Sequence, residues 1–123
     1  VAEAETGKKS VIRALQAWQF LIAKAQNRQV VRYDDVAKVM GYTDNRPLSQ
    51  ILNFIMLYCA QNSLPPLTMI VVNKDGTPGA GFTETARHEL DRKREEVFSF
   101  DWYGLVPPTI DELYEAYTNS KIS

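Results

Sequence analysis

Residues 48–62, LSQILNFIMLYCAQN, constrain the fold of this chain more than any other segment. Their apolar side chains recur three and four positions apart, which is the spacing of one face of an α-helix. The residues in this pattern are Leu48, Ile51, Leu52, Ile55, Met56 and Cys59. We therefore predict a helix over residues 46–62 with this stripe buried and with Ser49, Gln50 and Asn53 on its exposed side.

Two more helices are predicted before this one. KSVIRALQAWQFLIAKAQN, residues 9–27, has apolar residues at helical spacing and a possible start near Ser10, so residues 1–8 are expected to form a disordered tail. After the extended segment QVVRY, YDDVAKVMG has acids in its first turn and Gly41 as a stop. In the turn YTDNRP, Asn45 is a candidate N-cap for the long helix.

The segment after the long helix predicts a strand and a loop. SLPPL ends the helix, TMIVVN is β-branched and apolar, and NKDG is typical of a hairpin turn. A helix-turn-helix followed by a β-wing is a winged-helix arrangement. The expected fold is mainly α with a small β-wing: a winged helix-turn-helix domain over residues 9–82, with its wing at 73–82.

The last third of the chain predicts helices that cover this domain. TETARHELDRKREEVFSF is a charged helix with apolar Leu90 and Val97, and FSFDWYGLVPP is an aromatic, proline-rich strap. Thr109 and Glu112 fit a capping box before the short helix IDELYEAY. A chain of 123 residues is enough for one domain. We therefore expect residues 83–123 to form a C-terminal helical extension packed on the same domain.

Composition excludes several classes of protein. One cysteine, Cys59, allows no internal disulfide and fits the reducing cytoplasm, and no apolar run approaches the roughly 20 residues of a membrane span. With His88 as the single histidine, no usual zinc site can be built, and we expect no cofactor. Residues 8–50 hold eight Lys/Arg against three acids, whereas residues 51–123 hold six against ten.

Two blocks of the sequence resemble the DNA-binding domain of alkylguanine-DNA alkyltransferases and of the non-catalytic alkyltransferase-like proteins. These blocks are VVRYDDVAKVMGYTDNRPLSQIL and LPPLTMIVVNKDG…GAGF, and the likeness covers about residues 30–82. The resemblance implies that Tyr33 helps to rotate a nucleotide out of the duplex and that Arg46 fills the gap in the base stack.

The chain departs from that family at the reactive position. Where the family has proline, cysteine, histidine and arginine, this chain has LTMI, so Thr68 occupies the nucleophile's place and Met69 follows it. Asp34 replaces a glycine. Alkyl transfer needs a thiolate activated by a neighbouring base, and a threonine hydroxyl lacks that acidity. We therefore expect no enzymatic activity.

The expected function is non-catalytic DNA binding. The predicted contacts are Tyr33, Arg46, Ser49, Gln50, Asn53 and Lys74, with Thr68 and Met69 in the pocket at the lost nucleophile position. An alternative belongs to another class: a small protein-binding module, such as an inhibitor or immunity-type protein, whose acidic, aromatic residues 83–123 contact a basic partner.

Overall fold

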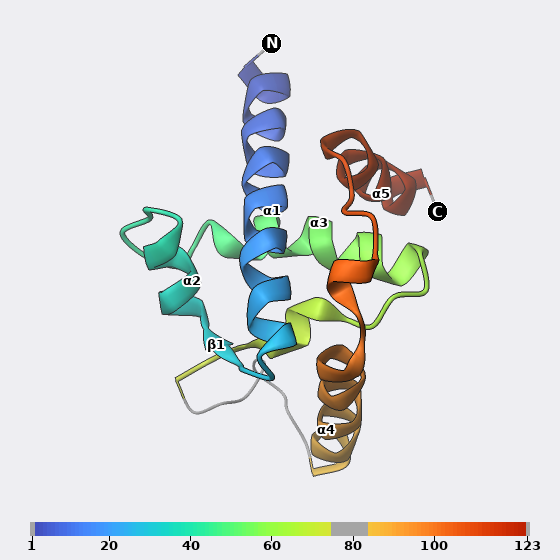
Figure 1. Ribbon diagram of the computed structural model, residues 1–123. Helices are drawn as coiled ribbons and strands as arrows, with labels where there is room; N and C mark the ends of the chain where they lie inside the picture. Colours follow the sequence, from blue (N-terminus) through green and yellow to red (C-terminus); the bar gives the residue numbers. More distant parts are fainter. Residues whose placement is uncertain (1, 75–83, 123) are drawn as a thin grey trace.

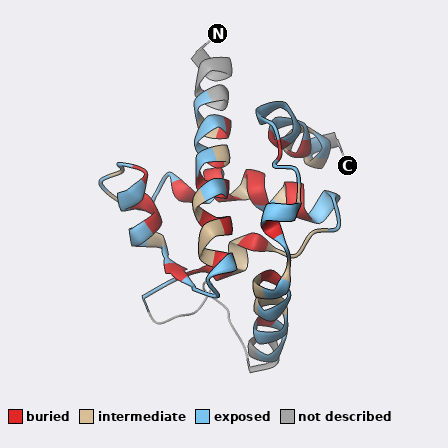
Figure 2. Cartoon of the chain, viewed as in Figure 1, coloured by how far each residue is buried: buried red, intermediate tan, exposed pale blue. Residues whose placement is uncertain are grey.

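Two helices, α1 (Ala2–Gln26) and α3 (Leu48–Gln61), form the centre of the molecule. The computed structural model describes residues 2–74 and 84–122, and Figure 1 shows α1 crossing α3. Buried residues gather at this crossing (Figure 2), and the rings of Trp18 and Tyr58 pack edge to face with their centroids 5.8 Å apart. The long helix is thus confirmed as a core element.

Helix α1 is longer than predicted. It begins at Ala2 rather than near Ser10, so residues 2–8, expected to be a disordered tail, belong to the helix. This segment is AEAETGK, and alanine and glutamate are strong helix formers that can extend a helix already anchored by its buried C-terminal half.

Helix α2 (Tyr33–Val39) precedes α3 in the predicted order. Gly41 ends it as expected, with φ at +82°, a left-handed conformation that favours glycine. The prediction of Asn45 as the N-cap was wrong. Pro47 is the N-cap residue and offers no side-chain bond, while the Asn45 amide donates to Asp34 Oδ1 at 2.9 Å. Asn45 therefore ties the α2–α3 connection back to α2.

The predicted strand TMIVVN is mostly not a strand. Residues Leu67–Ile70 form a short 3-10 helix, η1, and only Val71–Val72 form strand β2. The bond from Met69 N to Pro66 O curls the chain after the two prolines and thereby prevents an extended conformation. Strand β2 pairs in parallel with β1 (Val31–Arg32), Val31 opposite Val71. The predicted hairpin turn and wing lie largely in residues 75–83, outside the described part of the chain.

The C-terminal segment packs on the same hydrophobic core. It comprises α4 (Glu84–Ser99), the 3-10 turn η2 (Trp102–Gly104) and α5 (Ile110–Ile122). Buried residues of all three elements join the cluster built by α1 and α3. The predicted capping box is confirmed: Glu112 N donates to Thr109 Oγ1 at 3.1 Å, and Thr109 N donates to Glu112 Oε1 at 3.0 Å.

The described part of the chain is thus mainly helical, with a small two-stranded parallel sheet. None of its helices combines the length and apolar character needed to cross a membrane.

Candidate nucleic-acid interface

An open pocket lies between the start of α2, the exposed stripe of α3, and η1. Its volume is about 310 Å³, within the range of roughly 300–1,000 Å³ that small-ligand sites occupy. The described residues that line it are Tyr33, Ser49, Leu52, Asn53, Met56, Thr68, Met69 and Val71. Five of the predicted site residues therefore meet here, although they come from three separate segments of the sequence.

Helix α3 supplies one wall of the pocket from the side that it does not bury in the core. Ser49, Asn53 and Met56 are four and three positions apart and so share one face. The opposite faces carry the buried residues Leu48, Ile51, Ile55 and Tyr58. Met56 was predicted to be part of the buried stripe, but 47% of it is exposed. Met56 therefore lies beside Leu52 in the apolar part of the α3 wall of the pocket.

The other wall is η1, whose two end residues are buried and whose two middle residues are partly exposed. Leu67 and Ile70 are fully buried, whereas Thr68 and Met69 are partly exposed and line the pocket. Pro65 and Pro66 separate this wall from the end of α3 and set its direction. Thr68 and Met69, both predicted as pocket residues, thus line the pocket from this wall.

Arg94 holds η1 in place from α4. Its Nε donates to the main-chain oxygen of Met69 at 3.0 Å, and burial lowers the pKa of its guanidinium. The sequence analysis described this segment only as a charged helix with apolar Leu90 and Val97, so it missed Arg94. A signal was present: Leu90, Arg94 and Val97 are four and three apart, which puts Arg94 on the buried face of the helix.

Arg46 lies outside the pocket, in the turn before α3. Its backbone N, Nε and Nη2 donate to the Asp44 carboxylate at 2.9, 3.1 and 2.8 Å. These bonds lower the pKa of Asp44 to about 2, and they leave 88% of the Arg46 side chain exposed. An ion pair so open to water is weak, because the solvent screens it. Arg46 can therefore exchange Asp44 for another anion at little cost.

Gln50 and Lys74 also lie outside the pocket lining. Both are exposed, Gln50 on α3 and Lys74 two residues beyond β2. In the parallel register Arg32 lies opposite Val72, so β2 leaves the sheet on the same side as the start of α2. Arg32, at the end of β1, and Lys74, two residues beyond β2, are therefore two exposed basic residues near the end of the sheet from which α2 begins.

The described lining residues of the pocket offer hydrogen-bonding groups without a side-chain base that could activate a hydroxyl. They provide hydroxyls from Tyr33, Ser49 and Thr68, an amide from Asn53, and thioethers. No thiol, imidazole or carboxylate is among these lining residues. In the described part of the chain, no three His, Cys, Asp or Glu side chains gather as a metal site requires. His88 lies exposed on α4.

We predict that Cys59 stays unmodified in the folded protein. Burial raises the pKa of its thiol to about 11, so almost no nucleophilic thiolate exists at neutral pH. Neither a disulfide reagent nor a duplex with methylated guanine should add mass to the native protein, whereas the disulfide reagent should label one thiol in denaturant. Intact-mass spectrometry measures both. A stoichiometric adduct on the native protein would contradict this account.

The raised pKa of the Cys59 thiol predicts how the free energy of unfolding changes at alkaline pH. The thiol of the unfolded chain loses its proton first, since its pKa is the lower of the two. The unfolded state is therefore favoured as the pH rises from the ordinary thiol pKa towards 11, and the free energy of unfolding decreases over that range.

Comparison with protein-family models, with curated protein sequences and with solved structures found no match to this chain. The function of the pocket and of its surroundings is therefore inferred from the residues themselves.

Proposed function

We propose that this chain is a non-catalytic DNA-binding protein that uses α2 and α3 as a helix-turn-helix pair. In this proposal residues 9–82 form a winged-helix domain, α3 is the recognition helix, and residues 73–82 are the wing. The protein acts as alkyltransferase-like proteins do, without a reactive cysteine, and its single cysteine stays reduced in the cytoplasm.

The observation that carries the proposal is the pocket shared by Tyr33, Asn53 and Thr68. Tyr33 and Thr68 were singled out by the resemblance and Asn53 by the helical periodicity, and the three residues line one cavity large enough for a small ligand, whereas Arg46 lies outside it. A nucleotide rotated out of a duplex presents hydrogen-bonding edges and a flat apolar face. Hydroxyls, an amide and two methionines in one pocket match both features.

The exposed residues around the pocket complete the interface. Ser49, Gln50 and Asn53 lie along the open stripe of α3, where they can donate to and accept from base edges. Arg46, Arg32 and Lys74 supply positive charge for phosphates at the ends of this surface. Asp34, Asp35 and Asp44 lie among them and weaken the field, so we expect modest affinity and a shallow dependence on salt.

Arg46→Ala should weaken DNA binding because it removes a phosphate or base contact. The expected loss is about 5- to 150-fold in affinity. Asp44→Asn should act in the opposite direction, since it releases Arg46 from its ion pair and removes a negative charge. Fluorescence-anisotropy titration of short duplexes measures the affinity of each variant. Titrations at about 20 mM salt and at physiological salt compare weak with strong screening of the electrostatic contacts.

Arg92→Ala is the matched control for this experiment. Arg92 is also an exposed arginine, paired with Glu89 at 2.6 Å, but it lies on α4 rather than beside α3. Its replacement changes the net charge by the same amount and should leave DNA affinity nearly unchanged. If the parent protein binds no duplex even at the lower salt concentration, or if both arginine variants lose affinity equally, the proposed interface is wrong.

A further inference from the structure

An open pocket lies at the turn between α2 and α3, apart from the one that Tyr33 lines. Its volume is about 470 Å³. The described residues that line it are Tyr42, Thr43, Asp44, Arg46 and Pro47, and we call it the Tyr42 pocket. Arg46, a candidate DNA contact, therefore belongs to a hollow in the surface rather than to an isolated turn.

A second arginine reaches the Tyr42 pocket from α1. The Arg13 Cζ atom lies 5.7 Å from the centroid of the Tyr42 ring, within the range of a cation–π contact. The ring is a fixed platform, because Tyr42 packs against the core and its N donates to Ala37 O at 2.9 Å. Arg13 is thus held at the pocket although it is 29 positions away from Tyr42 in the sequence.

The charge of Arg13 is available to a ligand. Its Nη1 donates to Gln16 Oε1 at 3.2 Å, and in the described part of the chain it pairs with no carboxylate. A guanidinium carries five N–H groups, so most of them can still donate. Lys9 is also exposed and lies one turn before Arg13 on the same face of α1, where it adds positive charge.

Asp44 gives an independent indication that the Tyr42 pocket accepts an anion. Its carboxylate already accepts three hydrogen bonds from Arg46 inside this pocket. A phosphate presents the same kind of oxygen acceptors to a guanidinium. The Asp44 side chain is 42% exposed and that of Arg46 is 88% exposed, so a phosphate can replace this weak pair.

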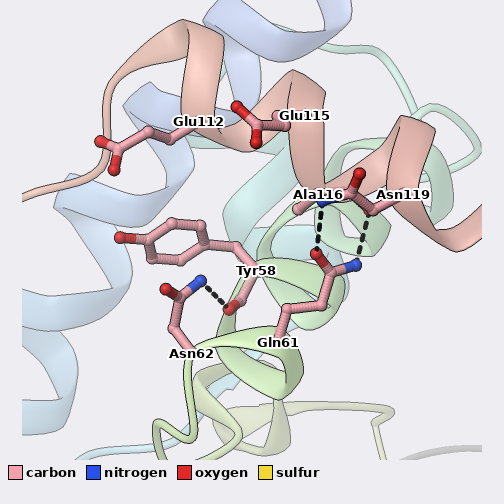
Figure 3. A pocket seen from close by; sticks show the side chains of 7 residues that line it. All are labelled: Tyr58, Gln61, Asn62, Glu112, Glu115, Ala116 and Asn119. Carbon is pink, nitrogen blue, oxygen red and sulfur yellow. Dashed lines mark hydrogen bonds between the residues drawn. The ribbon is translucent and has the colours of Figure 1, made fainter.

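The acidic helix α5 lies away from the Tyr42 pocket. In Figure 1, α5 is on the opposite side of α1 from α2 and the turn that follows it. Glu112, Glu115 and Tyr58 line a different pocket, between α3 and α5 (Figure 3), and no basic residue is among its described lining. Phosphates bound near Tyr42 therefore avoid the repulsion that these carboxylates exert.

We propose that Arg13, stacked on Tyr42, binds a backbone phosphate of DNA at the Tyr42 pocket, beside Arg46. Helix α1 is then part of the DNA-binding surface, although it lies outside the helix-turn-helix pair. Phosphate contacts of this kind fix the position of a protein on the duplex without reading its sequence. This inference rests on the proposed DNA binding and adds a contact to it.

Arg13→Gln tests the contact in fluorescence-anisotropy titrations of a short duplex. Affinity should decrease about two- to five-fold at physiological salt, the effect of one exposed ion pair. The slope of log affinity against log salt should become shallower by about 0.9, because one phosphate contact is lost. The decrease at about 20 mM salt should therefore be about six times larger than at physiological salt.

Two further variants test the role of the Tyr42 ring. Arg13→Lys keeps the charge without the planar guanidinium, so it should keep the salt slope of the parent and lose less affinity than Arg13→Gln. Tyr42→Leu removes the platform, and its effect should not add to that of Arg13→Gln in the double variant. Circular dichroism checks that each variant is folded, and the two Arg13 variants decide the question if Tyr42→Leu is not.

Arg28→Gln is the matched control. Arg28 is also an exposed arginine over an aromatic ring, 5.3 Å from the centroid of Phe98, but it pairs with Glu95 beyond the C-terminal end of α1. Its replacement should leave affinity and salt slope nearly unchanged. If the parent binds DNA but Arg13→Gln keeps its slope, or if Arg28→Gln changes the slope equally, this inference is overturned and the proposed function stands. If the parent binds no duplex at about 20 mM salt, both are wrong.

Discussion

Ile55→Asp should unfold the protein. Ile55 is fully buried in the centre of α3, within the cluster that joins α3 to α1 and α5. An unpaired carboxylate there loses its hydration and finds no partner, at a cost of several kcal/mol. Typical domains are stable by only about 5–15 kcal/mol, so most or all of the folded state should be lost. Far-UV circular dichroism during thermal and urea unfolding measures the change.

Met56→Asp is the control for this substitution. Met56 is the next residue, has the same apolar character in the sequence pattern, and is 47% exposed at the candidate interface. The free energy of unfolding should change by no more than about 1 kcal/mol, as is usual for surface positions. If Ile55→Asp melts near the parent temperature while Met56→Asp unfolds, the buried face of α3 has been assigned to the wrong side.

Trp102→Ala should destabilise the whole molecule rather than only its C-terminal segment. Trp102 is 1% exposed, its ring meets Trp18 at 5.6 Å and Phe100 at 4.6 Å, and its Nε1 donates to Val97 O at 2.8 Å. Truncating a buried tryptophan leaves a cavity and costs about 3–5 kcal/mol. The expected decrease in Tm exceeds about 10 °C.

The way in which this variant unfolds tests the role of residues 84–122. Because Trp102 packs directly on Trp18 of α1, urea should unfold the helices in one transition in both parent and variant. Tyr103→Ala is the neighbouring control, since Tyr103 is mostly exposed and its loss should change stability by about 0.5 kcal/mol or less. Two separate transitions in the parent would show that the extension is an independent unit.

Local interactions explain the successful predictions from sequence. The periodicity of α3, the stop at Gly41 and the capping box at Thr109 each depend on residues within a few positions of one another. Such features form wherever the segment lies in the fold. The same reasoning failed for TMIVVN, whose β-branched residues favour a strand. There the turn after Pro66 produces η1, and the bond from Arg94 to Met69 holds it in place.

Local sequence patterns were sufficient to predict the order of the main helices and to suggest candidate site residues, because both depend on neighbouring positions. Which of these candidates lie together depends on the packing of segments that are distant in the sequence. Tyr33, Asn53 and Thr68 share a pocket, whereas Arg46 is turned away towards Asp44, and Tyr58 faces Glu112 from a distant part of the chain. Helical periodicity defines an apolar face but not its partner, so it could not separate buried Ile55 from exposed Met56. That distinction arises because α1 and α5 together cover only part of the α3 surface.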